Sequence, residues 1–211
     1  MSNTVPTKAT LTSVNSNIDT YARRYNYYIK FTHLPTGHVV KFPSTLMSFS
    51  DTHTPEFSKQ YGNDTMDPTI ILNSTDRRVD FSFIVLNSSI DDARHNTQCV
   101  NLLIQMLYPL LDVEGSIIGN PYVKIEMQNL LNSGDGTSGV TCIIENIEFS
   151  MNLEEGVING NEGIYALNYS RKELYPISLE ISIGASSIME RGLNDINNFL
   201  PTSYPSYGGG A

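Results

Sequence analysis

The sequence predicts a mainly β, α+β fold: an antiparallel β-sandwich or barrel packed around one helix. Hydrophobic alternation of period two, which is typical of half-buried strands, recurs at Arg77–Leu86, Tyr122–Leu130 and Tyr175–Gly184. One segment, at about 89–108, places apolar residues at helical spacing over several turns. A run rich in glycine and polar residues at 132–139 has the composition of a hairpin loop. Strands therefore dominate, and the helix is expected to be buried among them.

The strand at Arg77–Leu86 and the helix that follows it organise the rest of the chain. Ser88 or Ser89 can cap the helix, and two aspartates in its first turn suit the partially positive N-terminus. Pro109 ends the helix, because a proline disfavours helical geometry at the residue before it. The apolar stripe of the helix is wide enough to require burial, and it comprises Ala93, Cys99, Val100, Leu102, Leu103, Met106 and Leu107.

The remaining strands follow from turns and alternation. A turn at Pro35–Gly37 predicts a hairpin of Tyr25–His33 with His38–Phe42. In the strand at Val140–Met151 the apolar phase changes near Glu145–Asn146, which predicts a β-bulge. The segment 110–120 reads as a connection, 164–169 as a short strand and 191–200 as a short amphipathic helix.

These patterns predict one domain with extensions. Residues 1–24 form an N-terminal arm, 25–189 the β domain and 190–211 a C-terminal extension, with both termini flexible. Within the domain, residues 43–76 form a long loop, in which short strands at 44–50 and 69–72 would make a projecting hairpin. Loops of this length are usually functional or bound to a partner.

The charge balance excludes several classes of function. There are 22 acidic and 13 basic residues, a net charge of −9, and no cluster of lysine and arginine that could grip a nucleic acid.

The first 19 residues are polar and unlike a signal peptide, and no apolar run approaches the ~20 residues that cross a bilayer. The chain is expected to be made in the cytoplasm and to have no contact with a membrane.

No motif predicts catalysis, a cofactor or a metal. Cys99 and Cys142 lie in apolar surroundings and are expected to be buried thiols, with a disulfide between them as the alternative. His95 precedes Cys99 by four residues and shares its helix face, but a thiol within the apolar stripe is inert. The histidines lack the spacing and number of a zinc site, and they are His33, His38, His53 and His95. We expect no enzyme.

Several predicted strands carry one apolar face and one polar, mostly acidic face. The polar faces could be the water-exposed outside of a sandwich, as antiparallel sheets often have. The alternative to this first interpretation is that they line a wet passage, as inside a barrel. The candidate residues for such a passage are Arg78, Asp80, Ser82, Lys124, Glu126, Gln128, Glu148 and Glu180.

Several motifs follow one another in a distinctive order. They are the helix end Leu107–Pro109, the strand start Asn120–Lys124, the run Glu148–Asn152 followed by Glu155–Ile158, and the strand start Leu174–Pro176. This order resembles that of the tail-tube-like baseplate proteins of contractile-tailed bacteriophages, which initiate tube polymerisation above the central hub. The resemblance covers roughly Asn26–Gly184 and is sharpest over Ala93–Ile183, whereas the extension past Met189 departs from the pattern.

This resemblance implies a β-sandwich plugged by one helix, and a homohexameric ring whose inner sheets join into one barrel. The implied partners are the baseplate hub, the tail tube and the tape measure protein, within a virion. The arm and the loop 43–76 would reach neighbouring subunits. The candidate residues above would face the lumen, through which DNA passes without specific binding. An acidic lumen suits that role, because a basic one would retain DNA.

Three alternatives remain. The chain could be a different baseplate adaptor or the tail tube protein itself. It could instead be a carbohydrate- or peptide-binding β-sandwich, although the sequence contains no tryptophan for an aromatic binding rim. A hydrolase is the third, and the missing triad and metal patterns disfavour it.

Overall fold

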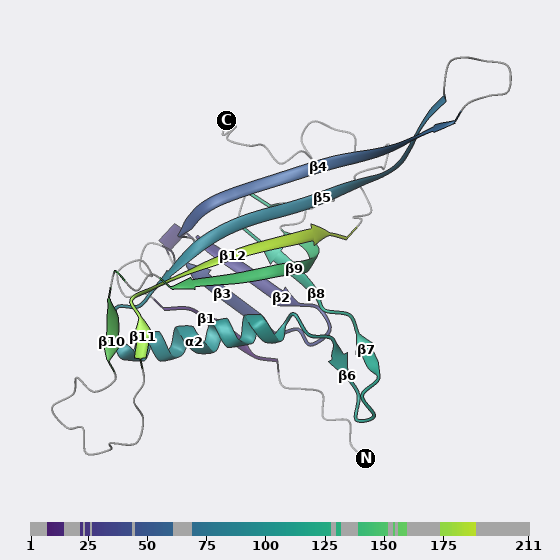
Figure 1. Cartoon of the computed structure of the whole chain (residues 1–211). Coiled ribbons are helices and arrows are strands. Elements are labelled where there is room, and N and C mark those ends of the chain that lie inside the picture. The colour runs from purple at the N-terminus through teal and green to yellow at the C-terminus, as the bar shows by residue number, and fades with distance from the viewer. Residues whose placement is uncertain are drawn as a thin grey trace.

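The computed structural model is built mainly of strands, with one long helix (Figure 1). It describes residues 8–14, 22, 24–25, 27–43, 45–60, 69–127, 130–131, 139–151, 154, 156–159 and 174–188. The mainly β, α+β prediction is confirmed. Within the described residues, no helix has the length and apolar character needed to cross a membrane.

Most strands belong to one mixed sheet of eight, in the order β1-β3-β2-β8-β9-β12-β5-β4. Neighbours are antiparallel except β1 and β3, which run parallel. Two small antiparallel pairs, β6 with β7 and β10 with β11, lie outside this sheet. The bounds of the eight are β1 (Thr10–Thr12), β2 (Tyr28–His33), β3 (Val39–Pro43), β4 (Leu46–Gln60), β5 (Thr69–Leu86), β8 (Tyr122–Glu126), β9 (Val140–Met151) and β12 (Ser178–Ser187). The small pairs are β6 (Leu110–Leu111), β7 (Ile117–Gly119), β10 (Val157–Asn159) and β11 (Leu174–Pro176).

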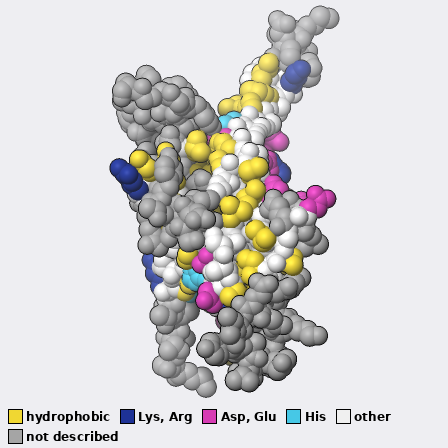
Figure 2. Space-filling model, turned by 90° about the vertical axis from the view of Figure 1, so that its left-hand side faces the viewer, with side chains coloured by type: hydrophobic (Ala, Val, Ile, Leu, Met, Phe, Trp, Pro, Cys, Tyr) yellow, Lys and Arg dark blue, Asp and Glu magenta, His cyan; other side chains and the backbone are white. Residues whose placement is uncertain are grey.

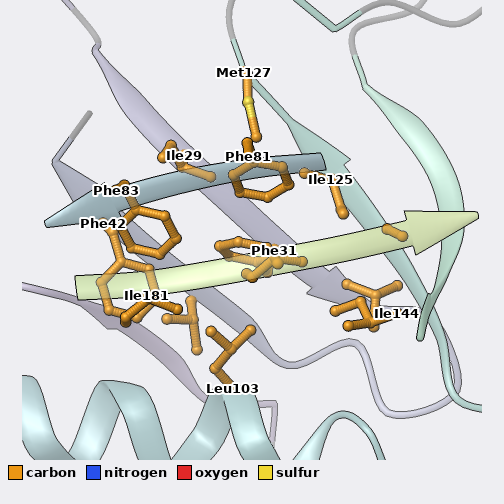
Figure 3. Close-up of a cluster of buried hydrophobic side chains, with 14 of the residues drawn as sticks. Ile29, Phe31, Phe42, Phe81, Phe83, Leu103, Ile125, Met127, Ile144 and Ile181 are labelled. Carbon is orange, nitrogen blue, oxygen red and sulfur yellow. The ribbon is translucent and has the colours of Figure 1, made fainter. Parts of the chain in front are cut away.

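The large sheet folds over on itself around an aromatic core (Figure 3). Phe31 on β2 lies 6.3 Å, between ring centroids, from both Phe81 and Phe83 on β5, although three strands separate β2 from β5 in the sheet. Phe42 on β3 lies 5.2 Å from Phe83. The sheet therefore has two facing halves, which we call the first half (β1, β3, β2, β8) and the second half (β9, β12, β5, β4). A single sheet thus makes a sandwich, and its two outer faces point in opposite directions.

The helix α2 (Ile90–Gln105) closes this core from below in the view of Figure 1, and Leu103 is fully buried against it (Figure 3). Its cap is Ser89, whose side chain accepts a hydrogen bond from the Asp92 N–H at 3.1 Å. The predicted helix extended about three residues further. After Gln105 the backbone tightens, and Tyr108 N–H donates to Gln105 O at 3.2 Å, because proline at the next position disfavours an α turn.

Part of the predicted N-terminal arm lies against the domain. Strand β1 pairs with β3, and Leu11 packs on the core. The segment after it is held by the buried Asn96 of α2, whose Oδ1 accepts hydrogen bonds from Ser13 Oγ and Val14 N, each at 2.8 Å. A buried amide with all of these partners satisfied fixes the segment more firmly than its polar composition suggests.

Some of the remaining sequence predictions fall on described residues, and others fall outside them. The bulge predicted near Glu145–Asn146 is confirmed, because the register of β9 against β12 shifts there. Cys99 and Cys142 are buried thiols, as predicted, and form no disulfide. The predicted strand at 164–169, the helix at 191–200 and the extension 190–211 lie outside the described residues.

Candidate interaction surfaces

Strands β4 and β5 continue beyond the domain as a two-stranded ribbon, which we define as residues 52–60 and 69–76 (Figure 1). Nearly all of its residues are exposed. The sequence predicted a projecting hairpin here with short strands, but the strands are longer than predicted: β4 has 15 residues and β5 has 18. Isolated two-stranded ribbons are marginally stable in water. Beyond the sheet this ribbon would therefore gain stability from contact with another surface.

The ribbon has one apolar face. Phe57 is paired with Leu72, and Lys59 with Ile70, so all four side chains lie on the same side of the ribbon. Along β4 this side alternates back to Phe49, which packs on the core. The exposed fractions of Phe57, Ile70 and Leu72 are 58%, 61% and 55%. We call this side, including Pro55, the inner ribbon face; Figure 2 shows hydrophobic side chains along the projecting ribbon.

A buried ion pair marks the point where the core ends and the ribbon begins. Arg77 donates from Nε to Asp51 Oδ1 at 3.0 Å and from Nη2 to Asp51 Oδ2 at 2.7 Å. The exposed fractions of the two side chains are 8% and 1%. This bidentate pair joins β4 to β5 at the base of the ribbon and fixes their register there.

An acidic surface covers the outer face of the second half of the sheet. Ser182 is paired with Ser82 on one side and Glu148 on the other, and Glu180 is paired with Ser150, so these side chains point the same way. The structure thus brings together these predicted lumen residues: Arg78, Asp80, Ser82, Glu148 and Glu180. We call this surface, with Glu145, the acidic face.

One arginine neutralises part of the acidic face. Arg78 donates to Asp80 Oδ2 at 2.9 Å and to Glu145 Oε2 at 2.8 Å. The hydrogen bond from Arg78 to Asp80 raises the pKa of the guanidinium, with the two carboxylate charges adding to the effect. Within the part of the chain that the structure describes, Glu148 and Glu180 have no ion-pair partner. These two carboxylates leave the face negative.

The other predicted lumen residues lie elsewhere. Lys124 and Glu126 are on β8, on the outer face of the first half, which points the opposite way. Glu126 binds Lys30 Nζ at 2.9 Å, and Lys30 is also paired across strands with Lys41. We call the surface of Lys30, Lys41 and Lys124 the basic face. Gln128, also predicted to face the lumen, lies outside the described residues.

A second apolar projection was missed by the sequence analysis, which treated it as a connection. Leu110–Gly119 forms the β6–β7 hairpin, which we call the finger (Figure 1). The exposed fractions of Leu111, Ile117 and Ile118 are 52%, 65% and 61%, and Val113 at the tip is fully exposed. The apolar run itself was the available signal, because four large aliphatic residues within one short polar-turn segment are unusual on a surface.

The finger tip is held rigidly by one aspartate. Asp112 Oδ1 accepts hydrogen bonds from the N–H groups of Glu114 and Ser116, each at 2.9 Å. The backbone of Asp112 bonds Ser116 O and Gly115 N–H as well. Gly115 takes a φ of +84°, which side chains other than glycine's disfavour. Val113 is therefore presented in one conformation, flanked by Asp112 and Glu114.

The nucleophile and metal candidates do not form a reactive site in the described residues. Burial raises the pKa of Cys99 to about 12, so its thiol stays protonated. The Cys99 sulfur lies 3.9 Å from His95 Nε2, but that nitrogen lies 2.7 Å from the carbonyl of Thr12 and is the donor to it. No group of three or more His, Cys, Asp or Glu side chains there could hold a metal ion.

His33 and His38 lie together beside α2, in a small pocket shared with Gln105. His33 Nδ1 is 2.7 Å from Thr36 Oγ1, and His33 Nε2 is buried without a partner among the described residues. Burial lowers the pKa of His33, and the neighbouring His38 lowers it further. His38 Nδ1 accepts a hydrogen bond from the Ala9 N–H at 2.9 Å. His38 therefore anchors the segment before β1.

Comparison with known proteins gives distant structural likenesses. No family model and no curated protein matches the sequence. A chain from the tail of an empty GTA particle with C6 symmetry overlaps 78% of this chain and 92% of its own length, at 9% identity and a TM-score of 0.34. A chain from the six-fold symmetrised baseplate of the anti-feeding prophage overlaps 80% and 93%, at 12% identity and a TM-score of 0.32. Scores this low do not establish a shared role.

Proposed function

We propose that this chain is a non-enzymatic structural protein of a contractile phage tail or baseplate. In this role it forms a ring, joins the central hub to the tail tube and initiates polymerisation of the tube. The sequence resemblance over Ala93–Ile183 suggested this role. The main structural support for this role is the ribbon, whose apolar face continues the core-side face of the sheet into open solvent.

The ribbon supports assembly because its inner face lacks a second layer. In the domain, the same side of β5 packs against the facing half of the sheet, as Phe81 does against Phe31. Beyond the Arg77–Asp51 pair no facing half remains among the described residues, and Phe57, Ile70 and Leu72 are exposed. A neighbouring subunit can supply the missing layer. A contact between two different surfaces of the same chain is head-to-tail, and it closes into a ring when the rotation fits.

The distribution of charge supports one orientation within the ring. The acidic face and the basic face lie on opposite outer surfaces of the sandwich, so only one can line a central channel. We place the acidic face inward, with Glu148 and Glu180 from each copy forming a collar of like charge. Such a collar repels the phosphate backbone and lets DNA pass without being retained. The basic face then lies outside.

A double charge reversal tests this role. Replacing Glu148 and Glu180 with lysine should leave folding intact, because both side chains are at the polar surface and neither has an ion-pair partner among the described residues. Particles carrying the double variant should assemble and contract but deliver DNA slowly, with the defect easing at higher salt because salt screens the added attraction. The measurement is the rate of DNA release from particles.

The control is Glu126→Gln, which removes a negative charge on the opposite outer face together with its ion pair to Lys30. It should leave DNA release unchanged. If the double lysine variant releases DNA at the normal rate, the acidic face does not line the channel. If the double lysine variant fails to assemble, Glu148 and Glu180 lie at an interface between subunits, and the proposed orientation is reversed.

A further inference from the structure

The finger and the ribbon are complementary surfaces at different ends of the molecule (Figure 1). The finger exposes aliphatic side chains at Leu111, Val113, Ile117 and Ile118, and the inner ribbon face exposes Phe57, Ile70 and Leu72. Clusters of large exposed apolar residues mark binding surfaces on soluble proteins. Because the two clusters lie apart in one copy, they can meet only between copies.

Charge complements this apolar match. The finger tip carries Asp112 and Glu114 on either side of Val113, both of them exposed. The inner ribbon face carries Lys59, which is paired across strands with Ile70 and so lies within the apolar cluster. In a chain with a net charge of −9, acidic surface on another copy would repel the acidic finger tip, whereas Lys59 offers it a cation within an exposed apolar face.

We propose that the inner ribbon face of one copy binds the finger of the next copy. The inference rests on the proposed ring and names its contact: Val113 packs between Phe57 and Ile70, while Glu114 lies near Lys59. The preorganised tip favours this contact, because a turn already fixed by Asp112 loses little conformational freedom on binding. The contact also covers the apolar side of the ribbon, which the isolated chain leaves in water.

Cysteine pairs test the contact directly. One preparation of the full chain carries Val113→Cys and a second carries Ile70→Cys; the two are mixed, assembled and oxidised. The native Cys99 and Cys142 are buried and do not compete. We expect a covalent dimer of the two variants on a non-reducing gel, because a disulfide forms only where Cα atoms come within about 7 Å. The matched control replaces Ile70→Cys with Ile71→Cys, which is exposed on the opposite side of the same ribbon. It should give no such dimer.

The outcomes separate this contact from the ring itself. Rings that form without a Val113–Ile70 crosslink, or that crosslink equally through Ile71, would overturn the contact and leave the ring proposal standing. Crosslinking of Ile70→Cys to an unlike tail protein in complete particles would assign the ribbon to that protein and overturn self-docking. A full chain that stays monomeric alone and occurs as a single copy in particles would contradict both proposals.

Discussion

Replacing Asp51 with alanine is expected to lower the free energy of unfolding by about 3–5 kcal/mol, because it leaves the buried guanidinium of Arg77 without its carboxylate. Both side chains are almost fully buried, and the pair holds β4 to β5 where the core ends. Loss of the pair should also loosen the ribbon. Urea unfolding followed by circular dichroism measures the change.

Two further variants show whether burial is the cause. Asp80→Ala breaks an ion pair to Arg78 that lies at the surface, so it should change stability little. A double replacement, Asp51→Leu with Arg77→Met, removes both charges and should recover most of the loss, because apolar residues of similar volume often replace buried pairs without cost. Equal effects of Asp51→Ala and Asp80→Ala would contradict the structural role of the buried pair.

Leu103→Ala should destabilise the chain by about 2–5 kcal/mol, through the lost burial of the side chain and the cavity left behind. Leu103 is fully buried where α2 meets the folded sheet. Asn101→Ala, on the exposed side of the same helix, is the control and should have a small effect. A urea midpoint for Leu103→Ala that matches wild type, with the same slope, would show that α2 is not part of the core.

The fold was predictable where alternation and helical spacing were strong. Val79, Phe81, Phe83 and Val85 were expected on one face of a strand, and all four are buried. The apolar stripe on α2 was likewise identified, because an apolar helix face that wide is stable only when it is buried in the core. The end of α2 was placed too late, since the apolar spacing continues to Leu107 while the last N–H groups bond three residues back, Leu107 to Ile104 O and Tyr108 to Gln105 O.

The candidate surfaces were predictable only in part. Alternation separates the two sides of a strand, but it does not say which half of a folded sheet the strand joins. Glu126 and Glu148 therefore gave the same signal, although the structure places them on opposite outer faces. The length of the ribbon was also hidden, because its strands are held by pairing with each other and carry mixed polar and apolar residues.

The finger was hidden for a related reason. Its strands are only 2 and 3 residues long, too short for a period to register. Its shape depends on Asp112, whose carboxylate accepts the N–H groups of the turn. Turn chemistry of this kind is visible in a sequence once the flanking strands are known. Both missed features are projections with exposed apolar side chains.

The central claim is that copies of this chain form a ring with the acidic face inward. The most direct test is an image of the assembled full chain, or of the particle that contains it, at a resolution that traces individual strands. We predict a closed ring whose channel is lined by β9, β12, β5 and β4, with Glu148 and Glu180 facing the opening. A channel lined instead by β1, β3, β2 and β8, with Lys30 and Lys41 facing it, or an assembly without a ring, would refute the proposed arrangement.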